Sequence, residues 1–203
     1  MMLKDGNILK YKKRALILSY FTVGYNILEG VFSIAAGILA NSIALEGFGM
    51  DSFVESLSGS VMIWRFRKYG RLSREAEERV EKRAARLVAA SFFVLAVYIL
   101  YESIRKLYFK EIPAPSPIGL IVVIMSIIIM PVLFYFKYRT GMLIKSRSLI
   151  ADSKETLACV LLSLAVLFGI GLNYLYGFWQ ADPIAGIFIA GYLVKEGYSS
   201  LKE

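Results

Sequence analysis

The sequence predicts an all-α polytopic membrane protein with six transmembrane helices, and three observations support this fold class. The chain of 203 residues is 57% hydrophobic, with a mean hydropathy of +0.58, well above an ordinary soluble domain. Its apolar residues form blocks long enough to cross a bilayer, which takes about 20 residues per helix. Basic residues gather in the short segments between these blocks. Six blocks leave no room for a soluble domain, so residues 1–203 are predicted to form one transmembrane domain.

The first three predicted spans cover about 15–39, 42–65 and 86–108. A basic segment ending at Arg14 precedes the first span, and Asn41 and Ser42 form a very short turn into the second. Between the second and third spans lies a basic stretch, and its part 74–86 also contains several glutamates. Such a mixed-charge run predicts a solvated helix that continues into the third span.

The last three predicted spans cover about 117–137, 149–174 and 180–200. Three prolines break the chain before the fourth span: Pro113, Pro115 and Pro117. A basic segment, 137–147, separates the fourth and fifth spans, and residues 177–183 turn the chain into the sixth.

The distribution of basic residues predicts the topology. With the N-terminus inside, the cytoplasmic segments and the C-terminal tail contain 20 of the 24 Lys and Arg residues. Cytoplasmic loops are enriched in Lys and Arg, so both termini are predicted to be cytoplasmic. The net charge of +8 is explained by this asymmetry and does not require nucleic-acid binding.

Two pairs of polar side chains lie inside predicted spans, and each pair is spaced by one helical turn. Asp51 and Glu55 belong to the second span, and Glu155 and Cys159 to the fifth. Residues four apart project from the same helix face. Asp51 lies about ten residues into its span, about 15 Å down the helix, where an unpaired charge costs at least a few kcal/mol. Ionisable groups at this depth usually mark an ion pathway, so the two pairs predict one cation site and hence a transporter.

Other polar residues accompany these pairs. Asp152 lies one turn before Glu155 and is predicted to be an access residue or a helix cap. Glu29 and Asn26 form a polar patch in the first span, which suggests a role beside the site or in proton relay. A purely structural role stays open for each of these residues, and a lone cysteine such as Cys159 is commonly a small buried hydrophobe.

The motifs resemble those of the cation diffusion facilitator family. The run from Asn41, followed by Asp51 and Glu55, is similar to the second helix of that family. Ala151-Asp152-Ser153, followed by Glu155 and Cys159, is similar to its fifth helix. The segments 98–107 and 182–186 resemble the end of its third helix and the start of its sixth, in the same order.

This resemblance implies a six-helix exporter of divalent cations that acts by proton antiport as a homodimer in the cell membrane of a prokaryote. By position, the implied metal ligands are Asp51, Glu55, Glu155 and Cys159. The sequence departs from the family in two ways: it has no histidine, and it stops at Glu203, just after the sixth span. The second departure predicts a member without the usual cytoplasmic C-terminal domain, whose dimer would depend on helix packing. Three small residues of the first span would permit close helix packing, either between subunits or within one bundle: Gly30, Ser33 and Gly37.

Three carboxylates and one thiolate favour Zn²⁺ as the substrate, while Mn²⁺, Fe²⁺, Co²⁺ and Cd²⁺ stay open. Two alternatives are a membrane metal-binding protein that regulates without transporting, and a carrier of monovalent cations or protons. An enzyme is not expected, because the sequence has no histidine and no zinc-protease or P-loop motif.

Overall fold

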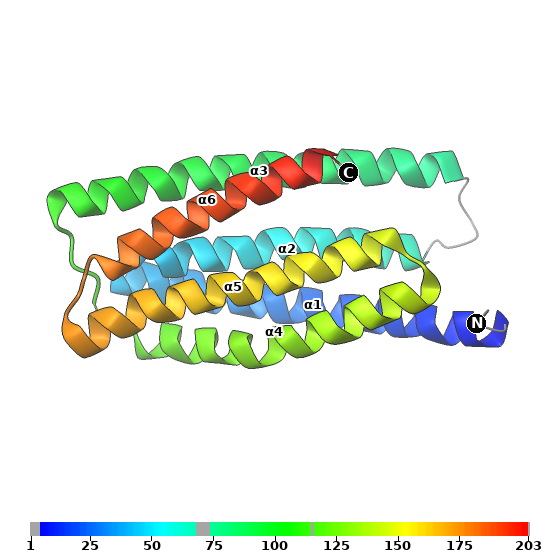
Figure 1. Ribbon diagram of the computed structural model, residues 1–203, viewed down its shortest axis with the longest axis horizontal. Coiled ribbons are helices and arrows are strands. Elements are labelled where there is room, and N and C mark those ends of the chain that lie inside the picture. Colours follow the sequence, from blue (N-terminus) through cyan, green and yellow to red (C-terminus); the bar gives the residue numbers. More distant parts are fainter. Residues whose placement is uncertain (1–4, 68–73, 115, 203) are drawn as a thin grey trace.

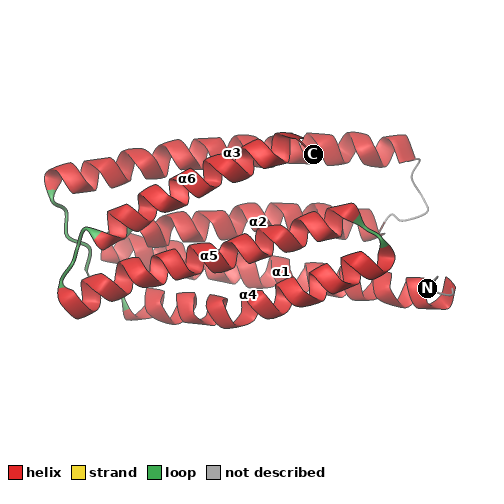
Figure 2. Cartoon of the chain, in the orientation of Figure 1, coloured by secondary structure: helices red, strands yellow, loops and turns green. Residues whose placement is uncertain are grey.

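The computed structural model describes residues 5–67, 74–114 and 116–202. These residues form six α-helices, which Figure 2 shows. The helices are α1 (Asp5–Ala40), α2 (Ile43–Arg67), α3 (Arg74–Phe109), α4 (Pro117–Ile144), α5 (Arg147–Tyr176) and α6 (Ala181–Lys202). The all-α membrane fold with six helices is therefore confirmed. Positions 68–73 of the predicted basic stretch, and Pro115, lie outside the described residues.

The helices fall into two groups, which Figure 1 shows along the length of the molecule. Helices α1, α2, α4 and α5 form a four-helix bundle, in which α1 packs mainly on α2 and α4 on α5. Helices α3 and α6 pack against each other and lie over one side of this bundle, against α2 and α5. Helix α6 runs back toward the end of the bundle where α1 begins, as an even number of spans requires.

The distribution of buried and exposed side chains is that of a membrane protein. Leu39 is 81% exposed and Phe168 is 65% exposed, whereas Lys137, Asn26 and other polar groups are completely buried. A large apolar surface around a polar interior suits a lipid environment and would be unfavourable in water. Among the described residues, helices α1, α4 and α5 contain segments that are long and apolar enough to cross a membrane.

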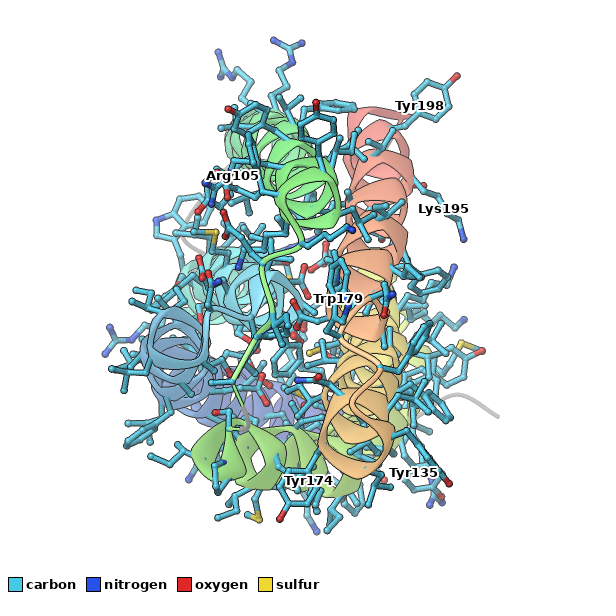
Figure 3. All side chains as sticks on the ribbon, turned by 90° about the vertical axis from the view of Figure 1, so that its left-hand side faces the viewer. Arg105, Tyr135, Tyr174, Trp179, Lys195 and Tyr198 are labelled. Atoms are coloured by element: carbon cyan, nitrogen blue, oxygen red, sulfur yellow. The ribbon has the colours of Figure 1, made fainter. Side chains whose placement is uncertain are left out.

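Aromatic side chains surround the bundle on its outer surface. Tyr135, Tyr174 and Tyr198 point away from the helices in Figure 3, and each is more than half exposed. Tyr108 and Tyr176 are about four-fifths exposed and lie near the end where α3 and α5 finish. Tyrosine is enriched at both membrane–water interfaces, so these residues fit the headgroup regions on either side of the apolar band.

Local sequence explains where the helices begin and end. Ser116 caps the N-terminus of α4 by accepting a hydrogen bond from the Gly119 amide, and Pro117 occupies the first turn, where a proline is tolerated. Ser146 caps α5 in the same way, so the structure does not support Asp152 as the cap of this helix. Gly177 ends α5 with a φ of 65°, a left-handed conformation that glycine adopts without strain.

The mixed-charge segment 74–86 is helical and continues into the third span as α3, as predicted. Helix α4, in contrast, extends seven residues beyond the predicted end of the fourth span, to Ile144. The predicted basic segment 137–147 is therefore largely helical. Lys137, the first residue of that predicted segment between the fourth and fifth spans, is a fully buried helical residue.

Small residues bring α1 and α2 into close contact. A Cβ atom added to Gly37 would lie 2.8 Å from the Glu46 backbone nitrogen, and one added to Gly30 would lie 3.0 Å from the Gly49 carbonyl oxygen. A Cβ atom on Gly49 would in turn lie 2.9 Å from the Ile34 backbone nitrogen. Of the two roles predicted for the small residues of the first span, the structure shows helix packing within one chain for Gly30 and Gly37.

The end of the bundle at the α1–α2 turn is tied by polar groups from α3 and α6. Asp182 is 1% exposed, accepts a hydrogen bond from the Ser42 hydroxyl and accepts a second from the Ile43 amide at 3.1 Å. Lys106 donates to the Asn41 carbonyl oxygen at 2.6 Å. The carboxylate of α6 thus caps α2 from a distant part of the sequence and fixes the start of the helix that carries Asp51.

Candidate metal site

Three of the four predicted metal ligands line one narrow, partly open cavity. Asp51 and Glu55 reach it from α2, and Glu155 reaches it from α5. Asp51 is 6% exposed and Glu55 is 4% exposed, so both carboxylates are almost completely removed from solvent. The two helices that the sequence predicted to share a cation site therefore do meet at their acidic residues.

Helices α3 and α6 complete the cavity with residues that the sequence analysis did not select: Phe92, Tyr192 and Glu196. Ala158 of α5 is its remaining lining residue. Glu196 is a fourth carboxylate at this cavity. In the sequence it is visible only as an acidic residue near the end of the sixth span, four residues after Tyr192. That signal did not indicate which neighbouring helix the residue would face.

The acidic side chains line the same cavity without closing on one point. Among the described residues, no three Asp, Glu or Cys side chains converge as a group that could hold a metal ion. Two of the carboxylate oxygens nevertheless have no hydrogen-bond partner, Oε2 of Glu55 and Oε2 of Glu155. Buried polar atoms in proteins normally have a partner, so these oxygens are available to a cation or to water.

The fourth predicted ligand, Cys159, is fully buried but does not line this cavity. Its thiol lies 3.9 Å from Oε2 of Glu29, which also accepts a hydrogen bond from Ser52 at 2.8 Å. Glu29 is 3% exposed, and its other carboxylate oxygen has no hydrogen-bond partner. Asn26, one turn away on α1, is fully buried, with neither amide atom hydrogen bonded. A second polar group, formed by Glu29, Asn26, Ser52 and Cys159, therefore occupies the four-helix bundle.

A buried cation lies beside the cavity at Lys137 of α4. Its Nζ atom is 2.9 Å from Oδ2 of Asp152 and 3.8 Å from Oε1 of Glu55. It also donates a hydrogen bond to the Thr156 hydroxyl at 2.9 Å. Asp152, predicted to be an access residue or a cap, forms an ion pair with this buried lysine.

Comparison with known proteins finds membrane transport proteins that resemble this chain over most of its length. The model of a cation efflux transmembrane domain matches residues 19–203, which is most of the chain. Transmembrane protein 163 of Xenopus laevis is 22% identical over 99% of this chain and 71% of its own length.

Two prokaryotic relatives match in the same way. The cadmium, cobalt and zinc/H(+)-K(+) antiporter of Bacillus subtilis is 24% identical over 94% of this chain, and the magnetosome protein MamB of a Magnetospira strain is 25% identical over 88%. This chain spans 61% and 60% of the lengths of these two relatives. From its match to the transmembrane domain model and its six-helix architecture, the chain belongs to the cation efflux, or cation diffusion facilitator, family of membrane transporters, which are not enzymes.

Proposed function

We propose that the protein exports a divalent metal ion, with zinc preferred, across the membrane in exchange for protons. The observation that carries this proposal is the cavity between α2 and α5, which is lined by the nearly buried carboxylates Asp51 and Glu55 and by the partly buried Glu155. Buried acids that face a shared space repel one another, and a divalent cation relieves that repulsion. Family membership supports divalent-cation transport, and the antiporter of Bacillus subtilis supplies the precedent for proton exchange.

The proposed ligands are Asp51, Glu55 and Glu155, with Cys159 as the fourth. The three carboxylates already line the same cavity. Binding a cation there would draw them together. Cys159 lies one turn from Glu155 on α5, and its thiol would have to turn from Glu29 toward the cavity to join the site. In this proposal Glu29 and Asn26 serve beside the site, where the unpaired oxygen of Glu29 can take up a proton and the amide of Asn26 can hydrogen bond to water.

Proton exchange follows from the chemistry of these ligands. Carboxylates and thiolates bind a metal only when deprotonated, so metal ions and protons compete for the same atoms. A state open to the cytoplasm would load metal and release protons, and a state open to the other side would take protons and release metal. A prokaryotic cell membrane and a homodimeric assembly are the proposed setting, and the matches to a bacterial antiporter and to MamB are compatible with it.

Flux measurements on purified protein in liposomes test this proposal. We expect a zinc gradient to drive zinc transport and an opposing proton flux, reported by a zinc-sensitive dye and a pH-sensitive dye inside the vesicles. Zinc that binds but does not cross the membrane would instead indicate a regulatory metal-binding protein. Proton or potassium flux that is independent of any divalent ion would indicate a monovalent-cation carrier.

The role of Cys159 can be separated from that of the carboxylates by comparing metals, because thiolate sulfur is a softer ligand than carboxylate oxygen. Thiolate sulfur favours zinc and cadmium, whereas Mn²⁺ prefers oxygen ligands. We therefore expect Cys159→Ser to weaken cadmium and zinc binding at least about tenfold and manganese binding less than about threefold. Isothermal titration with the three metals measures this difference, and Ser163→Ala, one turn further along α5, serves as the control. Equal affinities in the variant and the wild type would remove sulfur from the site.

A further inference from the structure

Lys137 is a completely buried ammonium group held by two helices. Its Nζ atom contacts Asp152 and Thr156 of α5, each at 2.9 Å, and lies 3.8 Å from Glu55 of α2. Removing a charge of each sign from water costs several kcal/mol per ion, and apolar residues of similar size often pack at least as stably. Stability alone is therefore a weak explanation for a lysine at this position.

Glu55 lies between this lysine and the cavity, and its two oxygens have different surroundings. Oε1 accepts a hydrogen bond from the Thr156 hydroxyl at 2.6 Å and is the atom that faces Lys137. Oε2 has no hydrogen-bond partner, while Glu55 also lines the cavity together with Asp51 and Glu155. One carboxylate is thus shared between a fixed cation of the protein and the place where a mobile cation would bind.

We infer that Lys137 is a tethered counter-ion that competes with the transported metal for Glu55, and that Asp152 limits this competition by holding the ammonium group. The inference rests on the proposed metal site at Asp51, Glu55 and Glu155. A fixed positive charge about 4 Å from a ligand oxygen repels an incoming divalent ion, and the low-dielectric interior strengthens that repulsion. Lys137 is therefore a positioning residue: it acts through Glu55, lowers the affinity for the metal and favours metal release.

A competing explanation is that the Lys137–Asp152 pair only fastens α4 to α5. The two explanations differ in the sign of their effects. With Asp152→Asn, the ammonium group loses its charged partner and acts more strongly on Glu55, so we expect zinc to bind about tenfold more weakly. With Lys137→Met and Asp152→Asn combined, both charges are gone and Glu55 is free, so we expect zinc to bind at least about tenfold more tightly and to be released more slowly.

Another buried lysine supplies the matched control. Lys106 is 2% exposed and donates to the backbone at the α1–α2 turn, away from the cavity-lining residues. Lys106→Met should leave the zinc affinity within about threefold of wild type, because it removes a buried charge that does not face Glu55. Zinc affinity is measured by isothermal titration of protein in lipid nanodiscs, and the release rate by stopped-flow with a zinc-sensitive dye.

The outcomes separate this inference from the proposed function. If Asp51→Asn binds zinc as well as wild type does, the proposed site is wrong and the inference falls with it. If Asp51→Asn loses zinc binding but the single and double variants of the pair shift affinity in the same direction, or not at all, only the counter-ion role is overturned. Should Asp152→Asn fail to fold, the charge-free double variant decides alone, and zinc affinity equal to or weaker than wild type would overturn the inference.

Discussion

Asp51→Asn is expected to reduce zinc transport at least about a hundredfold, because the variant removes the negative charge of a cavity-lining carboxylate that is a proposed metal ligand. Mutation of groups that merely support metal ligands typically costs about 10–100-fold in affinity or activity, so loss of a ligand should cost more. Asp51 is 6% exposed and lines the cavity with Glu55 and Glu155. Asparagine keeps the size of the side chain, so packing around the cavity should be preserved.

Zinc uptake into liposomes that contain equal amounts of purified variant and wild-type protein measures this effect. Glu46→Gln is the matched control, because Glu46 is also an acid of α2 but is half-buried and accepts a hydrogen bond from Tyr98 at 3.4 Å instead of lining the cavity. We expect Glu46→Gln to transport zinc within about threefold of wild type. Transport by Asp51→Asn at the rate of this control would contradict the assignment of the site to α2.

Gly49→Leu is expected to disrupt the contact between α1 and α2 and to have the largest effect on stability. Even a single Cβ atom at Gly49 would lie 2.8 Å from the Ile34 side chain and 2.9 Å from the Ser33 side chain, in addition to its contact with the Ile34 backbone nitrogen. Backbone atoms cannot move aside as a flexible side chain can, so the two helices must separate. Overpacking usually costs about 1–3 kcal/mol, and the rigid neighbours here place the expected loss at or above the top of that range.

Gly24→Leu provides the control for this prediction. Gly24 belongs to α1, is exposed, and has nothing within 4 Å of an added Cβ atom. Replacing it should leave stability unchanged or raise it slightly, because leucine favours a helix more than glycine does. Thermal unfolding in detergent, followed by size-exclusion fluorescence, compares the two variants. Melting temperatures that fall equally in both would mean that the α1–α2 contact is looser than these distances indicate.

Sequence patterns alone anticipated the arrangement of the chain along the membrane. Block length predicted six helices, and turn residues such as Asn41, Ser42 and Pro117 predicted where several of them begin or end. The one-turn spacing of Asp51 and Glu55 predicted that both face one way, and the cavity confirms that they share a surface. These features depend on the local geometry of a helix and on the thickness of a bilayer, which every sequence of this kind must satisfy.

Sequence patterns did not predict which residues surround the site. Hydropathy placed Lys137 in a loop, because a lysine has the same hydropathy value whether it is solvated or paired inside a helix bundle. Its burial depends on Asp152 and Glu55, which come from two other helices. The position of Glu196 beside Asp51 likewise depends on how α6 crosses α2.

The sequence by itself determined the membrane class, the number of helices and the two acidic helix faces that border one cavity. The tertiary structure alone decided which charges are neighbours: the lysine of α4 against Glu55 and Asp152, the thiol of Cys159 against Glu29, and Asp182 at the start of α2. Helical periodicity specifies the face on which a side chain lies, but not the helix that this face meets. That choice is made by close packing at residues such as Gly30, Gly37 and Gly49, which set how near two helices come and therefore which polar groups share the interior.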